Sequence, residues 1–167
     1  VADYVDAIRC VSGAACTAAN ASTNNQFVVL QYANQSARLW GLDLSGHMPL
    51  ASAGWGDWGL EGLLGLSRGV NRDTGDNLYN IMPLNARLAL TQKFVGWDNA
   101  LEFVMVKGKH SGSDARNEMD TPGYGLVNLR ASHSWKQVRL DFGIENLFDR
   151  LYYHPLGGAY TGQGTTM

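Results

Sequence analysis

The feature that most constrains this chain is a repeated alternation of apolar and polar residues. In segment 138–145 every even position is apolar, and every odd position is either charged or glycine. Successive side chains of a β-strand point to opposite faces, so this pattern predicts a strand with one apolar and one charged face. The pattern recurs in segments 40–45, 58–67, 84–93, 99–107 and 127–134, with a weaker strand near residues 2–9. The sequence therefore predicts an all-β fold of about seven strands.

The connections between these segments alternate between short and long. Residues 95–96 and 136–137 are short turns, the connection near 47–56 is intermediate, and the stretches 10–26, 68–80, 109–122 and 153–167 are longer and polar. Short turns join antiparallel neighbours, and a transmembrane β-barrel has tight turns on one side of the membrane and longer loops on the other. Aromatic residues gather at the tight-turn ends, as an interfacial girdle would place them: Trp55, Trp58, Phe94, Trp97 and Trp135.

Composition removes several other interpretations. Charged residues make up 17% of the chain and the net charge is -2, so nothing favours nucleic acid as a partner. No apolar run approaches the roughly 18 residues of a transmembrane helix, whereas a membrane strand needs apolar residues only at alternate positions. The first residues, Val1 to Tyr4, lack the basic start and apolar core of a signal peptide. We expect either a removed leader or a chain that begins inside a larger protein.

Two soluble folds share this alternation, namely an antiparallel sandwich and an eight-stranded ligand-binding barrel. The tryptophans at one rim and the unequal connections favour the membrane barrel over both. An arginine that faces lipid at the bilayer midplane costs about 2–4 kcal/mol. We therefore expect the charged face to line an interior filled by a polar plug and to form cross-strand pairs. The residues expected on that face are Asp43, Glu61, Arg87, Glu102, Arg130, Arg139, Asp141 and Glu145.

Residues 143–153, GIENLFDRLYY, resemble a motif near the C-terminus of TonB-dependent receptors, where an alternating strand ends in Asn-Leu-Phe-Asp followed by aromatic residues. Here the motif residues are Asn146, Leu147, Phe148 and Asp149. Residues 37–46, ARLWGLDLSG, look like a recurring barrel strand of that family. Residues 68–90, 121–130 and 152–167 resemble its copper-receptor branch, and the matching stretches cover well over half of the chain.

The resemblance implies an antiparallel transmembrane barrel of 22 strands around an N-terminal plug. Residues 1–167 would form one domain, the C-terminal part of that barrel, with the plug domain and the final strand absent from it. The implied location is the bacterial cell outer membrane. The implied partners are outer-membrane lipid, the protein's own N-terminal plug and remaining barrel strands, and the TonB complex, which would engage an N-terminal segment outside this chain.

The function implied by the resemblance is active import, with copper or a copper complex as the transported ligand and no cofactor in this segment. Alternatives are a receptor for a siderophore or another metal complex, a passive porin-type barrel, a surface adhesin barrel and a secreted β-sandwich. No enzyme is expected, because the chain lacks HExxH and phosphate-loop motifs. Ser132, His133 and Ser134 resemble a hydrolase dyad, but neighbouring strand residues point to opposite faces, and we interpret them as barrel lining.

Two cysteines, Cys10 and Cys16, lie in the small-residue segment CVSGAAC. An exported setting favours a disulfide between them, with free thiols and a metal-binding pair as the alternatives. A zinc or redox motif would need a CxxC spacing or a second pair, and neither is present.

Sulfur and imidazole side chains are the ligands that copper prefers, so methionines and histidines near the long loops are candidates for a weak metal-collecting surface. The candidates are His110, Met119, Met82 and His154. The better explanation is an exposed loop histidine and a methionine that fills apolar space. His47 and Met48, on the tight-turn side, are poorer candidates, and the principal metal site is expected upstream of this chain.

Overall fold

The chain is all-β wherever its structure, a computed structural model, describes it, namely at residues 4–9 and 30–157. These residues form eight strands: β1 (Tyr4–Arg9), β2 (Leu30–Gln35), β3 (Ala37–Ala53), β4 (Gly56–Asn71), β5 (Asn85–Phe94), β6 (Trp97–Val106), β7 (Tyr124–Ser134) and β8 (Arg139–Ile144). Within the same ranges, no helix has the length and hydropathy needed to cross a membrane. The predicted all-β class is confirmed, and β2 is a strand that the alternation did not predict.

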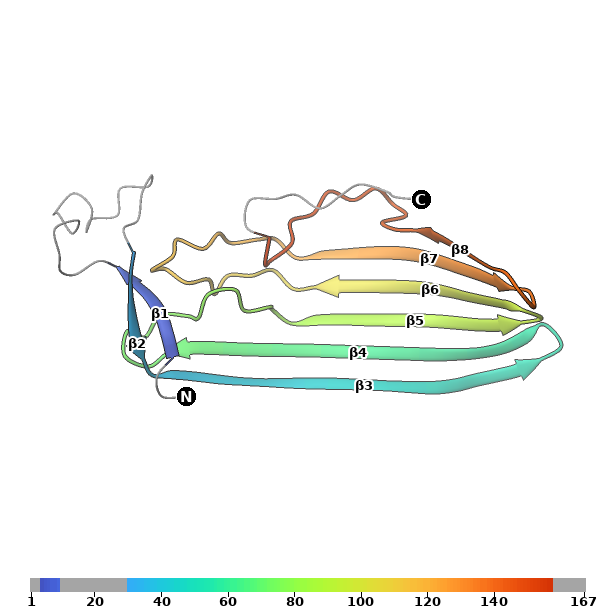
Figure 1. The fold of residues 1–167 in the computed structure, drawn as a ribbon, viewed down its shortest axis with the longest axis horizontal. Helices are drawn as coiled ribbons and strands as arrows, with labels where there is room; N and C mark the ends of the chain where they lie inside the picture. Colours follow the sequence, from blue (N-terminus) through green and yellow to red (C-terminus); the bar gives the residue numbers. More distant parts are fainter. Residues whose placement is uncertain (1–3, 10–29, 158–167) are drawn as a thin grey trace.

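Strands β3 to β8 form one antiparallel meander in which every strand pairs with its neighbours in the sequence, while β1 and β2 pair separately (Figure 1). The turns β3–β4, β5–β6 and β7–β8 lie together at one end of the sheet. The long connections 72–84 and 107–123 lie at the other end (Figure 1). We call these the tight-turn end and the long-loop end. The predicted alternation of short and long connections is therefore confirmed for the connections between β3 and β8, whereas residues 10–26 and 158–167 lie outside the described residues.

The expected intermediate connection near 47–56 is wrong. Strand β3 continues to Ala53, and only two residues separate it from β4. Proline interrupts a strand because it cannot donate to the ladder, and it is tolerated at a bulge. The pairing between β3 and β4 shifts register between Pro49 and Ala51. This bulge accommodates the proline and allows the strand to continue past it.

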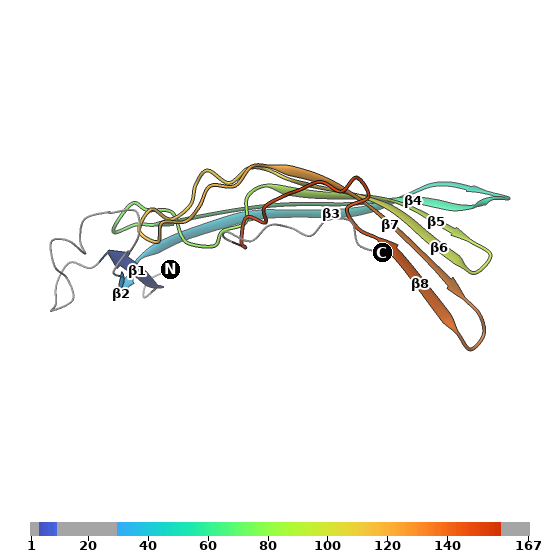
Figure 2. The same ribbon diagram turned by 90° about the horizontal axis from the view of Figure 1, so that it is seen from above.

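The six-stranded sheet is strongly twisted. Seen from above, the tight-turn ends of β5 to β8 fan away from those of β3 and β4 (Figure 2). Strands twist in one sense because of backbone sterics, and the twist accumulates across a sheet. Among the described strands the sheet stays open, since β3 and β8 each pair with a single neighbour in it.

Burial is inverted relative to a soluble sheet, in which apolar side chains are the buried ones. The buried side chains of the sheet include Glu102 and Asn128, at 4% and 7% exposure. In contrast, Leu44 and Phe142 are 62% and 59% exposed. The large apolar side chains of one face therefore lie uncovered, and the polar interactions lie on the other face.

Candidate functional site

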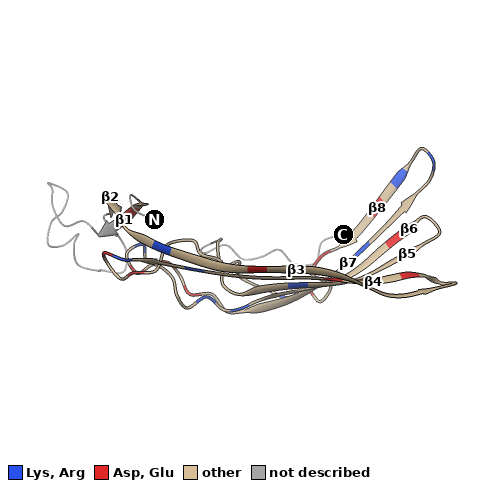
Figure 3. Cartoon of the chain, turned by 90° about the horizontal axis from the view of Figure 1, so that it is seen from below, with Lys and Arg blue, Asp and Glu red and all other residues tan. Residues whose placement is uncertain are grey.

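All eight predicted charged residues share one face of the sheet. Directly paired residues of antiparallel strands point to the same side, and the side-chain period along each strand is two. The register pairs Glu61 with Ala89, Ala89 with Glu102 and Glu102 with Asn128, which fixes one face across four strands. We call it the charged face, and it carries Asp43, Glu61, Arg87, Glu102, Arg130, Arg139, Asp141 and Glu145. Figure 3 shows that basic and acidic residues are interspersed along the strands.

Glu102 is the buried centre of this face. Its carboxylate forms an ion pair with Arg87 on β5 and accepts a 2.8 Å hydrogen bond from the Asn128 side-chain amide on β7. The expected cross-strand pairing is confirmed here. Asn128 was not among the predicted residues, because an uncharged amide in an alternating strand carries no signal of its partner.

The remaining charge pairs are exposed. Arg130 Nη2 lies 3.1 Å from Glu145 Oε1 across two strands, whereas Arg139 Nε contacts Asp141 Oδ1 at 2.9 Å along β8. Arg139 also donates to the Ser132 hydroxyl at 3.1 Å. Exposed pairs of this kind stabilise a fold by about 1 kcal/mol at most. They therefore add little to the stability of the sheet.

The Asn-Leu-Phe-Asp motif forms a turn that Asn146 organises. Asn146 is 3% exposed, and its backbone φ of 53° lies in the left-handed region. Its N–H donates to Asn128 Oδ1 at 2.9 Å. Its side-chain amide bonds to both backbone groups of Arg150, donating to the carbonyl at 2.9 Å and accepting from the N–H at 3.0 Å. Glu102 therefore orients Asn128, and Asn128 in turn fixes the start of the turn.

The segment after β8 leans over the charged face at the long-loop end. The Tyr152 ring packs 4.5 Å from the ring of Tyr124, whose register partner Val106 belongs to that face. The carbonyl of Pro155 accepts a hydrogen bond from Lys109 Nζ, which belongs to connection 107–123. The motif turn thus directs the following residues across the sheet end.

Asp76 joins the two long connections. Its carboxylate accepts hydrogen bonds from the Ser113 hydroxyl at 2.8 Å and from the N–H groups of Asp114 at 2.9 Å and Ala115 at 3.0 Å. Burial acts to raise the pKa of Asp76. These bonds, with one from the Asn77 N–H, outweigh burial and hold its pKa below the usual 3.8.

Lys109 and Glu118 form a buried ion pair beneath the same connections. Their side chains are 1% and 8% exposed. Glu118 also accepts hydrogen bonds from the N–H of Asn80 at 3.1 Å and from that of Ser113 at 2.9 Å. The pair therefore ties connection 107–123 to connection 72–84. We call Asp76, Lys109, Glu118 and their partners the loop cluster.

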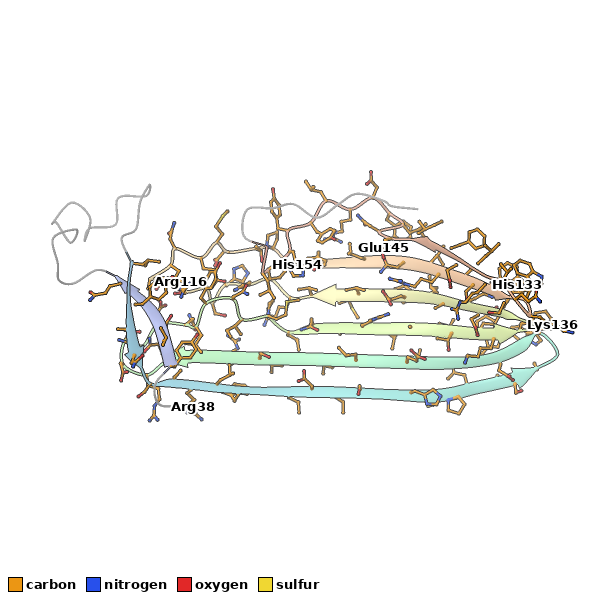
Figure 4. The ribbon with its side chains drawn as sticks, viewed as in Figure 1. Arg38, Arg116, His133, Lys136, Glu145 and His154 are labelled. Carbon is orange, nitrogen blue, oxygen red and sulfur yellow. The ribbon has the colours of Figure 1, made fainter. Side chains whose placement is uncertain are left out.

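Arg116 links the loop cluster to the β1–β2 pair. Its guanidinium lies 4.7 Å from the ring centre of Tyr79 and 5.9 Å from that of Tyr32 on β2. Its Nη2 is 3.8 Å from a carboxylate oxygen of Asp6 on β1. Figure 4 labels Arg116 beside the two short strands. Sequence patterns do not predict this cluster, since its members lie in segments that are far apart in the chain and have no shared period.

The expected aromatic rim is confirmed at the tight-turn end. Trp55 and Trp58 pack with ring centres 5.4 Å apart. His133, labelled in Figure 4, contacts both Trp97 and Trp135, at 4.6 and 4.3 Å. His133 pairs with Leu140 and so belongs to the apolar face, which corrects its interpretation as barrel lining. Its neighbours in the sequence point to the opposite side, so no hydrolase dyad forms.

The candidate metal ligands do not converge. His110 Nδ1 lies 3.2 Å from Asp120 Oδ2, with both side chains exposed. His154 Nδ1 accepts a hydrogen bond from the Leu156 N–H, Met119 is exposed, and Met82 is half-buried. Among the described residues, no group of three or more His, Cys, Asp or Glu side chains could hold a metal ion. Cys10 and Cys16, and with them the expected disulfide, lie outside the described residues.

A family model described as TonB dependent receptor-like, beta-barrel, matches residues 3–147. The copper transporter OprC, a solved structure, matches with a TM-score of 0.75 at 21% identity, over 86% of this chain and 24% of that chain. At this identity the likeness concerns the fold alone.

Sequence relatives are found among heme/hemopexin utilization proteins C of Haemophilus influenzae. The protein of strain 86-028NP is 36% identical over 117 residues, which cover 60% of this chain and 15% of the relative. That of strain ATCC 51907 is 32% identical over 117 residues, covering 60% and 14%. The chain thus spans about a seventh of the length of these relatives.

Proposed function

Because this chain belongs to the TonB-dependent receptor family and has its β-barrel fold, we propose that it forms part of the wall of an outer-membrane import receptor. Members of this family are transporters rather than enzymes. In the proposal, β3 to β8 are consecutive wall strands near the C-terminal end of a larger barrel. The protein's own plug fills the interior, the remaining strands close the barrel, and the TonB complex drives import through a segment outside this chain.

The observation that carries this proposal is the inverted burial of the sheet. A soluble sandwich would cover Leu44 and Phe142 with a second sheet, whereas here they stay exposed beside a hydrogen-bonded charged face. In the hydrocarbon core of a membrane, an apolar face contacts lipid and does not require a covering layer of protein. The charged face then lies against polar partners in the interior, which suits the mixed charges of its pairs.

We propose a metal or metal complex as the imported substrate, with copper or a copper complex first. The support is the resemblance of residues 68–90, 121–130 and 152–167 to copper receptors, together with the fold shared with copper transporter OprC. The second candidate is heme, a metal complex, because the sequence relatives are heme/hemopexin utilization proteins. Neither candidate assigns a ligand to residues of this chain, and we place the main binding site outside it.

The test is uptake by cells that carry the full-length receptor, measured separately for radiolabelled copper and for heme. We expect uptake of one of the two to rise above that of cells without the receptor, and the increase to disappear when TonB is deleted. Uptake that persists without TonB would identify a passive porin-type barrel. A full-length protein that stays monodisperse in buffer without detergent would contradict the membrane barrel itself.

A further inference from the structure

The apolar face carries two full charges in the six-stranded sheet, all of which the structure describes, and both are arginines. Arg38 pairs with Val70, and Trp40 pairs directly with Arg68, so all four side chains belong to the apolar face. The rest of this face is apolar, aromatic or neutral, and every acidic residue of β3 to β8 lies on the charged face. The two arginines are therefore neighbours on adjacent strands, surrounded by apolar side chains.

Both arginines lie at the long-loop end and lack an acidic partner among the described residues. Arg38, labelled in Figure 4, lies near the start of β3. Arg68 lies near the end of β4 and donates to the Ser111 hydroxyl at 3.1 Å. Both side chains are exposed, and Trp40 beside them is 52% exposed. Each guanidinium therefore has free donors directed away from the sheet's own carboxylates.

The separation of the two rims matches the thickness of a membrane. Trp58 marks the tight-turn rim and Arg68 the opposite one, ten positions apart on β4. At about 3.3 Å per residue this is roughly 33 Å along the strand. A strand tilt of about 40° reduces it to roughly 25 Å across the bilayer, the height of the apolar band of membrane barrels. The arginines thus lie at the headgroup level on the long-loop side.

We propose that Arg38, Trp40 and Arg68 form a docking site for the phosphate-bearing headgroup of a lipid in the leaflet on the long-loop side. The proposal rests on the proposed membrane function, because it needs the apolar face in lipid. Guanidinium groups match phosphate oxygens in geometry and charge. The neighbouring tryptophan suits the boundary between headgroups and chains, and the apolar pair Leu42 and Leu66 directly below continues the surface for an acyl chain.

Charge complementarity favours a lipid phosphate over other occupants of this patch. An acidic protein partner would have to approach a band that otherwise exposes apolar side chains to hydrocarbon. A headgroup without phosphate would leave the two positive charges uncompensated at the edge of a low-dielectric layer, and a zwitterionic headgroup brings its own cation beside its phosphate. A lipid with a net-negative, phosphate-bearing headgroup satisfies both charges and covers the adjoining apolar surface with one molecule.

The test uses the full-length receptor in nanodiscs of neutral phospholipid. The affinity for added lipid A is compared with that for dephosphorylated lipid A and for inorganic phosphate alone. The variants are Arg38→Gln, Arg68→Gln and the double variant. The matched control is Lys136→Gln/Arg150→Gln, which removes two positive charges from exposed positions outside the patch. Each arginine near an anionic lipid surface contributes about fivefold, so the double variant is expected to bind lipid A about 25-fold more weakly.

The wild type and the control are expected to bind lipid A equally and to lose that binding on dephosphorylation. The headgroup site would be refuted if the double variant bound lipid A as tightly as the wild type does. It would also be refuted if the wild type bound dephosphorylated lipid A as tightly as lipid A. Binding of inorganic phosphate as tight as that of lipid A would replace it with a site for free anions. If a receptor that still transports shows no phosphate-dependent binding of lipid A, only the headgroup site is refuted. A receptor that cannot be inserted into nanodiscs also refutes the proposed function.

Discussion

Asn146 meets three demands that few other side chains meet together. Its backbone adopts a left-handed conformation, its buried N–H needs the acceptor on Asn128, and its amide replaces two missing backbone partners of Arg150. Asparagine tolerates a positive φ better than most residues, and its short amide reaches the local backbone. The first residue of the family motif is therefore explained by turn geometry rather than by contact with a substrate.

Replacing Asn146 separates these contributions. Asn146→Ala should lower the free energy of unfolding of the full-length barrel by about 2–4 kcal/mol. It loses two hydrogen bonds and adds the cost of a left-handed alanine. Asn146→Gly loses the same bonds but accepts the positive φ, so it should cost about 1 kcal/mol less. Urea unfolding of the reconstituted receptor measures both. Equal stability of the two variants would show that the backbone conformation is unimportant.

At the scale of single residues, the alternation correctly predicted the face of the sheet on which each charged side chain lies. It predicted the interaction partners of those side chains only in part. The side on which Glu102 and Arg87 lie follows from counting positions along a strand. The pairing of Glu102 with Asn128 depends on the register between β6 and β7, which the lengths of the connections determine. Likewise, His47 directly opposes Glu61 on the charged face, although its position in the sequence indicated only the tight-turn side. Periodicity is local information, whereas register is not.

The two long connections behave as one element because Asp76 accepts three hydrogen bonds from Ser113, Asp114 and Ala115 across them. A pKa below 3.8 in the folded protein means that folding favours the ionised carboxylate. The stabilisation is present above the unfolded pKa and is lost as the pH falls through the lower, folded pKa. We expect hydrogen exchange in residues 113–115 to accelerate as the pH drops below 3.8, after correction for the intrinsic pH dependence of exchange. Asp76→Asn should show that fast exchange already at neutral pH, whereas the exposed control Asp120→Asn should match the wild type.

The buried pair beneath these connections should respond asymmetrically to substitution. Lys109→Met leaves the Glu118 carboxylate buried without its cation, which typically costs about 3–5 kcal/mol. Lys109→Met/Glu118→Gln removes both charges and keeps an oxygen acceptor for one of the two backbone N–H groups, so it should recover part of that loss. Thermal unfolding and the rate of protease cleavage within 107–123 report the effect. A double variant less stable than the single one would show that the pair contributes through its hydrogen bonds rather than through charge balance.

Among the strands, β3 shows where sequence patterns lose information. Its second half contains His47, Pro49 and several small residues, which interrupt the alternation of segment 40–45. The strand continues because β4 supplies a long regular partner and a bulge accommodates the proline. The loop cluster is a stronger case, since Asp76 and Ser113 are 37 positions apart and meet only in the folded chain. Contacts between irregular segments leave no period in a sequence.

For the whole molecule, the decisive question is what covers the apolar face. Nitroxide labels at Leu42→Cys and Leu44→Cys, on that face, and at Asp43→Cys and Ser45→Cys, on the charged face, address it in the full-length receptor reconstituted in liposomes. Molecular oxygen concentrates in hydrocarbon, whereas a water-soluble nickel complex is excluded from it. If the face meets lipid, oxygen accessibility should be high at 42 and 44 and low at 43 and 45, with a period of two.

The same measurement separates the alternatives because each predicts a different pair of profiles. A second sheet packed on the apolar face would make positions 42 and 44 inaccessible to both reagents. A plug packed against the charged face protects 43 and 45 from nickel, whereas an open aqueous pore exposes them. The labelling experiment therefore tests, in the assembled receptor, what the inverted burial of β3 to β8 implies. The apolar side of the sheet should respond to lipid and its charged side to whatever fills the interior.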